Sequence, residues 1–187
     1  TVSGRVIKGP LEKADVFLDF NGNEKLDYGE PLVETHADGS FDLTTGSTSY
    51  NIVALTDEGT LDTSSGSVLS GITLTAPKGA TVITPTTTLM QEGGLTAAQV
   101  AAVLGVPDGV DLLTFNPYAI GVNTADALAV EIAAQQVVAV VTAFAGAAEG
   151  AGASPEDAFT AAIQSVAEVV KMKAEAAAAD STASAES

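Results

Sequence analysis

The stretch LDFNGNEKLDYGEP, residues 18–31, places acid and amide side chains at regular intervals between two strand-like segments. Counted from Asp19 as position 1 of a twelve-residue loop, these side chains fall at positions 1, 3, 5, 9 and 12, and a lysine fills position 7. This is the ligand order of an EF-hand calcium loop. The predicted metal residues are Asp19, Asn21, Asn23, Lys25, Asp27 and Glu30.

The ion explains the residue types in this loop. Calcium is a hard cation that takes about six to eight oxygen ligands at about 2.3–2.6 Å. Asp19, Asn21 and Asn23 would each give a side-chain oxygen, Lys25 its backbone carbonyl, and Glu30 two oxygens. Asp27 would act directly or through a water. The alternative is an Asx-rich hairpin loop whose side chains bond their own backbone, but the ligand order favours calcium.

The loop departs from an EF-hand in two respects. Glu24 stands at position 6, where the motif has a glycine for its sharp turn, although Gly22 could take up some of that strain. The flanks VFLDF and PLVETH also resemble strands and not helices. We therefore expect an EF-hand-like loop set between two strands.

Composition restricts the class of protein. The 187 residues include 24 Asp plus Glu against 7 Lys plus Arg, for a formal net charge of −17. Such a surface argues against binding nucleic acid or an anionic membrane, because both need basic side chains. With no cysteine, a disulfide framework, a thiolate zinc site and a cysteine nucleophile are excluded. No signal peptide is visible at Thr1, and we expect a piece of a longer chain.

The chain divides into two halves of different pattern, which predicts an α+β fold. Residues 1–84 favour a β-sandwich-like, calcium-binding subdomain, because β-branched and aromatic runs alternate with turn residues. The predicted strands cover residues 2–8, 14–20, 31–36, 40–45, 50–55, 71–76 and 81–85.

Residues 85–173 favour a helical subdomain. Thr96 and Gln99 form a capping box, and the helix that they open should end near Gly105. A long helix from residue 124 or 125 to about 146 is apolar nearly all round, which predicts a buried central helix and not a membrane span. Ser154 and Pro155 open the last helix. Residues 174–187 are of low complexity and form either a fraying helix end or a linker.

The other candidate polar residues do not have the spacing of a ligand motif. Asp57, Glu58 and Asp62 could hold a second ion, but a solvated acidic loop is favoured. His36 is the single histidine and is interpreted as a surface imidazole. TPTTTLM, residues 84–90, is interpreted as a strand-to-helix junction whose threonines bond the backbone. No catalytic or phosphate-binding motif is present, so we expect no enzyme.

The segment GRVIKGPLEKADVFLDFNGNEKLDYGEPLVETHADGSFDL, residues 4–43, resembles the calcium-loaded β modules of bacterial surface proteins. Together with the TPTTT junction and the helices, most of the chain to about residue 170 is similar to a module of very large repeats-in-toxin-type (RTX) adhesins. The resemblance implies an Ig-like, extracellular, calcium-binding module that serves in cell-surface attachment and biofilms. In that family a glycine usually stands where this chain has Glu24.

The resulting hypothesis is a non-catalytic, calcium-stabilised adhesin module whose partners are neighbouring domains of the same adhesin. One alternative is a module that binds sugar or peptide, although aromatic residues are only 5% of the chain. Another is a self-association module that pairs through exposed apolar helical surface. No nucleic-acid partner and no membrane insertion are expected.

Overall fold

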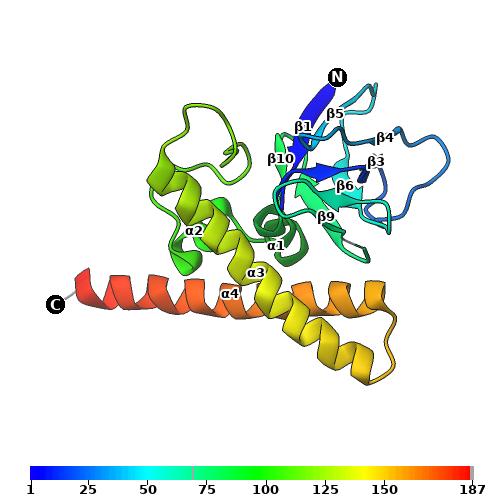
Figure 1. Ribbon diagram of the computed structural model, residues 1–187. Coiled ribbons are helices and arrows are strands. Elements are labelled where there is room, and N and C mark those ends of the chain that lie inside the picture. Colours follow the sequence, from blue (N-terminus) through cyan, green and yellow to red (C-terminus); the bar gives the residue numbers. More distant parts are fainter. Residues whose placement is uncertain (69, 186–187) are drawn as a thin grey trace.

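The computed structural model describes residues 1–68 and 70–185 and places the strands before the helices (Figure 1). The strands are β1 (Val2–Val6), β2 (Leu11–Glu12), β3 (Asp15–Asp19), β4 (Leu32–Glu34), β5 (Ser40–Leu43), β6 (Asn51–Leu55), β7 (Leu61–Asp62), β8 (Ser67–Val68), β9 (Thr73–Pro77) and β10 (Val82–Ile83). The helices are α1 (Pro85–Gly93), α2 (Ala97–Leu104), α3 (Thr124–Gly150) and α4 (Pro155–Ala185). The predicted α+β class is confirmed.

The strands form three small sheets. An antiparallel sheet has the order β4-β3-β6-β9, with Phe17 opposite Val53 and Val53 opposite Thr75. A second sheet has the order β10-β1-β5, in which β1 and β10 run parallel. The two-residue strands β2, β7 and β8 form the third, within stretches that we predicted as turn and loop. Because so short a pairing leaves no alternating pattern, the sequence gives no sign of it.

Strands β3, β6 and β9 of the four-stranded sheet are buried on both faces, whereas the edge strand β4 is largely exposed. One face shares a core with the β10-β1-β5 sheet, formed by side chains such as Leu18, Ile52 and Phe41. The opposite face carries Phe17, Val53 and Thr75, which are also buried. Thr75 bonds to helix α1, so α1 covers this second face. Such two-sided burial explains the consecutive apolar residues 16–18 in β3 and 52–54 in β6.

A buried group of threonines joins the β half, residues 1–84, to the helical half, residues 85–185. Thr84 caps α1 by accepting from the Thr87 N–H, and the Thr87 hydroxyl accepts from the Thr84 N–H. The Thr87 hydroxyl also donates to the Thr75 carbonyl at 2.8 Å. The predicted junction is therefore confirmed: the hydroxyls satisfy backbone groups that would otherwise be buried without partners.

The capping predictions for the later helices hold. Thr96 and Gln99 form the capping box of α2, and Gly105 ends that helix in a left-handed conformation. The Ser154 hydroxyl accepts from the Asp157 N–H at the start of α4. α4 continues through residue 185, so the described part of the predicted tail is helix, while residues 186 and 187 lie outside the described residues.

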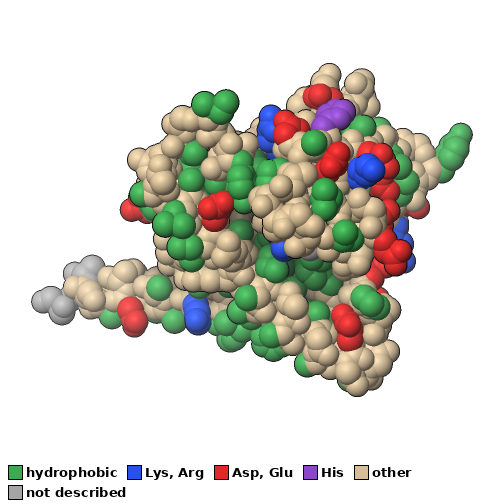
Figure 2. All heavy atoms as spheres, viewed as in Figure 1, with side chains coloured by type: hydrophobic (Ala, Val, Ile, Leu, Met, Phe, Trp, Pro, Cys, Tyr) green, Lys and Arg blue, Asp and Glu red, His purple; other side chains and the backbone are tan. Residues whose placement is uncertain are grey.

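The prediction that the long helix is buried nearly all round is wrong. One side of α3 packs against the helical core, but Leu128, Ile132, Val140 and Phe144 are 44–55% exposed. Figure 2 shows hydrophobic side chains at the surface where α3 and α4 cross. Alanine and valine occur on every side of α3, so the sequence pattern does not show which side is buried. The position at which α4 crosses α3 determines the buried side.

Helix α3 is also, among the described residues, the one helix long and apolar enough to cross a membrane. Its most apolar window has a mean hydropathy of 1.8 and is 28% buried. Core helices of soluble proteins share this property.

Candidate metal centre

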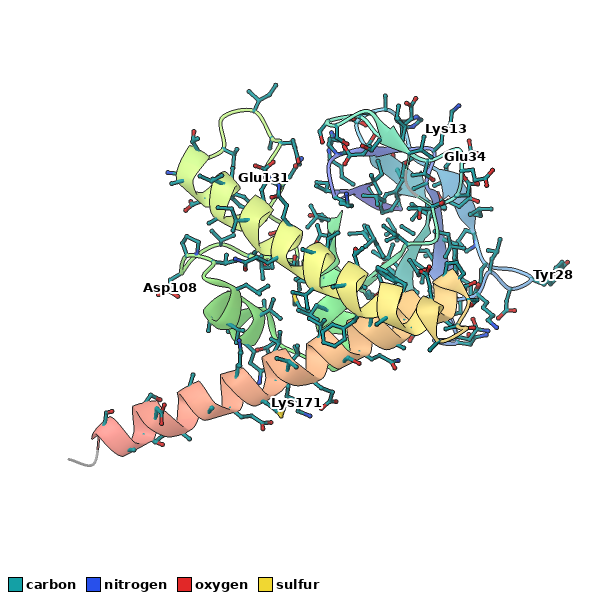
Figure 3. All side chains as sticks on the ribbon, turned by 60° about the horizontal axis from the view of Figure 1, so that its bottom comes forward. Lys13, Tyr28, Glu34, Asp108, Glu131 and Lys171 are labelled. Atoms are coloured by element: carbon teal, nitrogen blue, oxygen red, sulfur yellow. The ribbon has the colours of Figure 1, made fainter. Side chains whose placement is uncertain are left out.

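The predicted metal residues all lie on the loop that connects β3 to β4, at the edge of the four-stranded sheet. Asp19 ends β3 and is 1% exposed, whereas the rest of the loop extends into solvent. Figure 3 shows Tyr28 near the loop tip, with its side chain pointing away from the body of the protein. The loop is therefore anchored by a buried residue at its start and exposed to solvent at its tip.

Asp19 organises the first part of the loop. Its Oδ1 accepts from the N–H groups of Asn21 and Gly22 at 3.0 and 2.7 Å, and its Oδ2 accepts from the Glu24 N–H at 2.8 Å. The last bond ties position 6 of the loop back to position 1. Glu24 adopts a φ of 58°, the left-handed conformation that an EF-hand glycine supplies at this position.

The two asparagines and Asp27 close the middle of the loop. Asn21 Nδ2 and Asn23 Nδ2 both donate to Asp27 Oδ2, at 2.6 and 2.8 Å. The side-chain oxygens of the asparagines accept from backbone N–H groups two residues later, which are Asx turns. Positions 3, 5 and 9 of the loop therefore converge on one point.

Glu30 closes the loop with both carboxylate oxygens. Oε1 accepts from the Phe20 N–H and Oε2 from the Asp27 N–H, each at 2.8 Å. The carboxylate thus spans the two arms of the loop from position 12, where an EF-hand places its bidentate ligand. The Lys25 side chain is exposed, as a carbonyl ligand at position 7 requires.

The donor set fits calcium in chemistry, and binding requires a local rearrangement. It combines three carboxylates with two amides and a carbonyl, all hard oxygen donors. Among the described residues, however, no three or more His, Cys, Asp or Glu side chains are grouped to hold a metal ion. The amide nitrogens now contact Asp27, so Asn21 and Asn23 must turn their oxygens to the ion. Each amide oxygen has a second lone pair, which allows its Asx turn to persist.

Glu24 connects the loop to the helical half. Its carboxyl has a pKa raised to about 8, first by burial and then by the hydrogen bond and charge of Glu92 on α1. Asp19 and Glu156 raise the pKa further. A groove of about 300 Å³ beside it is lined by the loop and by the first turns of α4, including Asp157 and Gln164. No sequence pattern predicts this contact, because Glu24 and Glu92 belong to distant segments.

The other candidate residues are not brought together. Asp57 accepts from the Gly59 N–H within its own turn, whereas Asp62 is buried and accepts from Ser64 and Ser65. Glu58 is exposed, and so is His36, whose backbone N–H pairs with Ser40. These residues form no second cluster in the described part of the chain.

No protein-family model, no curated protein and no solved structure matches this chain.

Proposed function

We propose that this chain is a non-catalytic, calcium-stabilised module of a secreted bacterial adhesin of the repeats-in-toxin type, acting outside the cell. In this proposal the β half is a β-sandwich-like, Ig-like subdomain that carries an EF-hand-like loop, and neighbouring domains of the adhesin are its partners. The two sheets that share one hydrophobic core support the description of the β half as a β-sandwich. The resemblance of residues 4–43 to modules of bacterial surface proteins supports the proposed place outside the cell.

The observation that carries the proposal is the backbone at position 6 of the loop. Glu24 has a left-handed φ and donates its N–H to Asp19. A non-glycine residue in this conformation costs about 1–2 kcal/mol, and in this loop the cost falls at the position where an EF-hand has its glycine. The loop keeps the turn that ties position 6 back to position 1 and lets Asn21 and Asn23 meet Asp27.

Calcium would act by joining parts of the module. The ion would hold Glu30, the last residue of the loop, close to Asp19, which ends β3, and so fix the edge of the four-stranded sheet. Because Glu24 contacts Glu92 on α1 and the loop borders α4, a fixed loop would also hold the helical half at one angle. In an adhesive fibre, this would set the direction of the next domain.

The expected stabilisation is modest. Extracellular sites of this kind bind calcium with dissociation constants of about 10⁻⁴–10⁻³ M. At about millimolar calcium, a site of about 10⁻⁴ M would add about 1.4 kcal/mol to the free energy of unfolding. For a chain of this size, that predicts a rise of about 3–6 °C in Tm.

Thermal unfolding with calcium and with a chelator tests the proposal. Glu30→Gln should remove most of the rise in Tm, because it removes one charged oxygen of the bidentate ligand. Glu34→Gln is the matched control, since Glu34 is exposed on β4 outside the loop and should keep the full rise. Equal Tm values for the unmodified protein in the two buffers would refute the calcium site.

Self-association is the second candidate function, favoured by the exposed apolar side of α3. The side chains of Leu128, Ile132, Val140 and Phe144 follow one another at intervals of four or eight residues and so share one face. A second copy would cover this face. Light scattering should then give a mass that rises with concentration, and Ile132→Ser should abolish the rise. A constant monomeric mass at all concentrations would refute self-association.

A further inference from the structure

A second concave site lies away from the metal loop, between the β half and helix α3. It is a cleft of about 420 Å³, within the size range of small-molecule sites. It shares no lining residue with the groove beside the metal loop. The β half contributes Lys8, Asp62 and Ser64, the segment before α3 contributes Tyr118, and α3 contributes Gln135 and Val138.

Lys8 presents an ammonium group with free donors to this cleft. Its side chain is 23% exposed, and its Nζ lies 4.0 Å from Asp62 Oδ2, beyond hydrogen-bond distance. Within residues 1–68 and 70–185, the Lys8 ammonium has no other ion-pair partner and no hydrogen bond. An ammonium group carries three donors, so a ligand oxygen could bind here without displacing a protein group.

Asp62 is held in place as an acceptor beside Lys8. Its Oδ1 accepts from the N–H and hydroxyl of Ser64 at 2.9 and 2.6 Å and from the Ser65 N–H at 3.2 Å. These bonds leave Oδ2 on the side of Lys8. Gly9 makes this arrangement possible, because a Cβ there would collide with the Asp62 carboxylate and the Ser64 hydroxyl. The carboxylate is therefore preorganised by the local sequence.

The opposite wall adds a phenol, an amide and an apolar patch. Burial, and then the neighbouring Glu131 carboxylate, raise the pKa of Tyr118 to about 12, so its hydroxyl keeps its proton at neutral pH. Figure 3 shows Glu131 near the start of α3, on the side that faces the β half. Gln135 offers both a donor and an acceptor, and Val138 supplies a small apolar surface.

We propose that this cleft binds a neutral saccharide unit through the Lys8 ammonium, the Asp62 carboxylate and the Gln135 amide. Neighbouring ring hydroxyls are at once donors and acceptors, which matches this mixed set of protein groups. The C–H face of the sugar ring would lie against Tyr118 and Val138. An anionic ligand is disfavoured, because Lys8 is opposed by Asp62 and Glu131 in a protein of net charge −17. The proposal does not depend on the calcium loop.

The test uses the full chain in saturating calcium and a panel of neutral mono- and disaccharides, followed by NMR titration of the backbone amides. Binding should shift the amides of residues 64–67, Tyr118 and Gln135. Lys8→Met should weaken affinity about tenfold or more, the usual effect of losing a charged hydrogen bond. Lys171→Met is its matched control, because Lys171 is exposed on α4 and lines no part of the cleft.

Gln135→Ala and Gln136→Ala form a second matched pair on α3. Both residues are exposed, so both variants should fold, but only Gln135 lines the cleft. Loss of affinity in the first variant alone supports the proposal. The proposal is overturned if no panel sugar binds at about 10 mM, if the shifts map elsewhere, if both glutamine variants lose affinity equally, or if a free amino acid binds the cleft more tightly than every sugar.

Discussion

The β half buries large side chains on both faces of its main sheet, whereas the helical half packs small ones along one side of α3. Phe17, Leu18 and Ile52 are fully buried in the first half. In the second half, the buried residues of α3 are all alanine or valine, among them Ala133 and Val137. Small side chains let helices approach closely but remove less apolar area from water. The packing of α3 should therefore contribute less stability per residue than the packing of the main sheet.

The largest expected effect tests that difference with one residue type in both halves. Phe17→Ala should lower the free energy of unfolding by about 3–5 kcal/mol, because it leaves a cavity in the sheet. Phe144→Ala is the matched change on α3, where the ring is 50% exposed. It should cost about 1 kcal/mol or less. Urea unfolding gives both values, and equal losses would show that the two halves do not differ in this way.

The next effect concerns backbone strain at the border between the halves. Glu24 and Lys13 are the two non-glycine residues with positive φ in the described chain, both at 58°. Replacing either with glycine should raise stability by about 0.5–1 kcal/mol, since strain of about 1–2 kcal/mol is relieved and the unfolded chain gains freedom. Chemical denaturation in chelator measures both changes.

Glu24→Gly should stabilise the protein more than Lys13→Gly, because it also removes a half-buried carboxyl group from its contact with Glu92. The difference between the two increases in the free energy of unfolding measures the cost of the contact between Glu24 and Glu92. A loss of stability in Glu24→Gly, together with a gain in Lys13→Gly, would show that the Glu24 side chain holds the two halves together.

Local signals were enough to predict the helix caps, the loop and the strands outside the small β2-β7-β8 sheet. The predicted strand at residues 14–20 became β3, Asp15–Asp19, and the Thr96 capping box formed as expected. These features depend on residues that are close in sequence. Of the predicted metal residues, Asn21, Asn23 and Asp27 meet through their side chains, whereas the metal site and calcium itself stay predictions. The orientation of the asparagine amides depends on the hydrogen bonds of the whole loop, and no residue type reveals it.

Contacts between distant segments could not be predicted in this way. The exposed side of α3 follows from the direction in which α4 crosses it. The contact of Glu24 with Glu92 joins a β loop to α1, and the cleft at Lys8 needs β1, β7 and α3 in place. Each arises only when the two halves pack together, and their sequences show no shared pattern.

A separate expected effect is a dependence of stability on pH at the same border. The pKa of Glu24 is about 8 in the folded protein, against an ordinary value of 4.5. Between these values the folded state binds more protons than the unfolded state, so stability falls as pH rises. The contribution of Glu24 is fully present below about 4.5 and lost above about 8. Thermal unfolding in chelator across this range should show the decline.

Glu24→Gln should flatten that decline, because an amide has no proton to lose in this range, whereas Glu34→Gln on the exposed strand β4 should leave it unchanged. Calcium acts in the opposite direction. An ion in the loop would favour the charged carboxylate and shift the decline to lower pH, so adding calcium should reduce the difference between Glu24→Gln and the unmodified protein at neutral pH. If the slope of stability against pH is unchanged in Glu24→Gln, another group titrates in this range. Glu24 would then not link the loop to the helices.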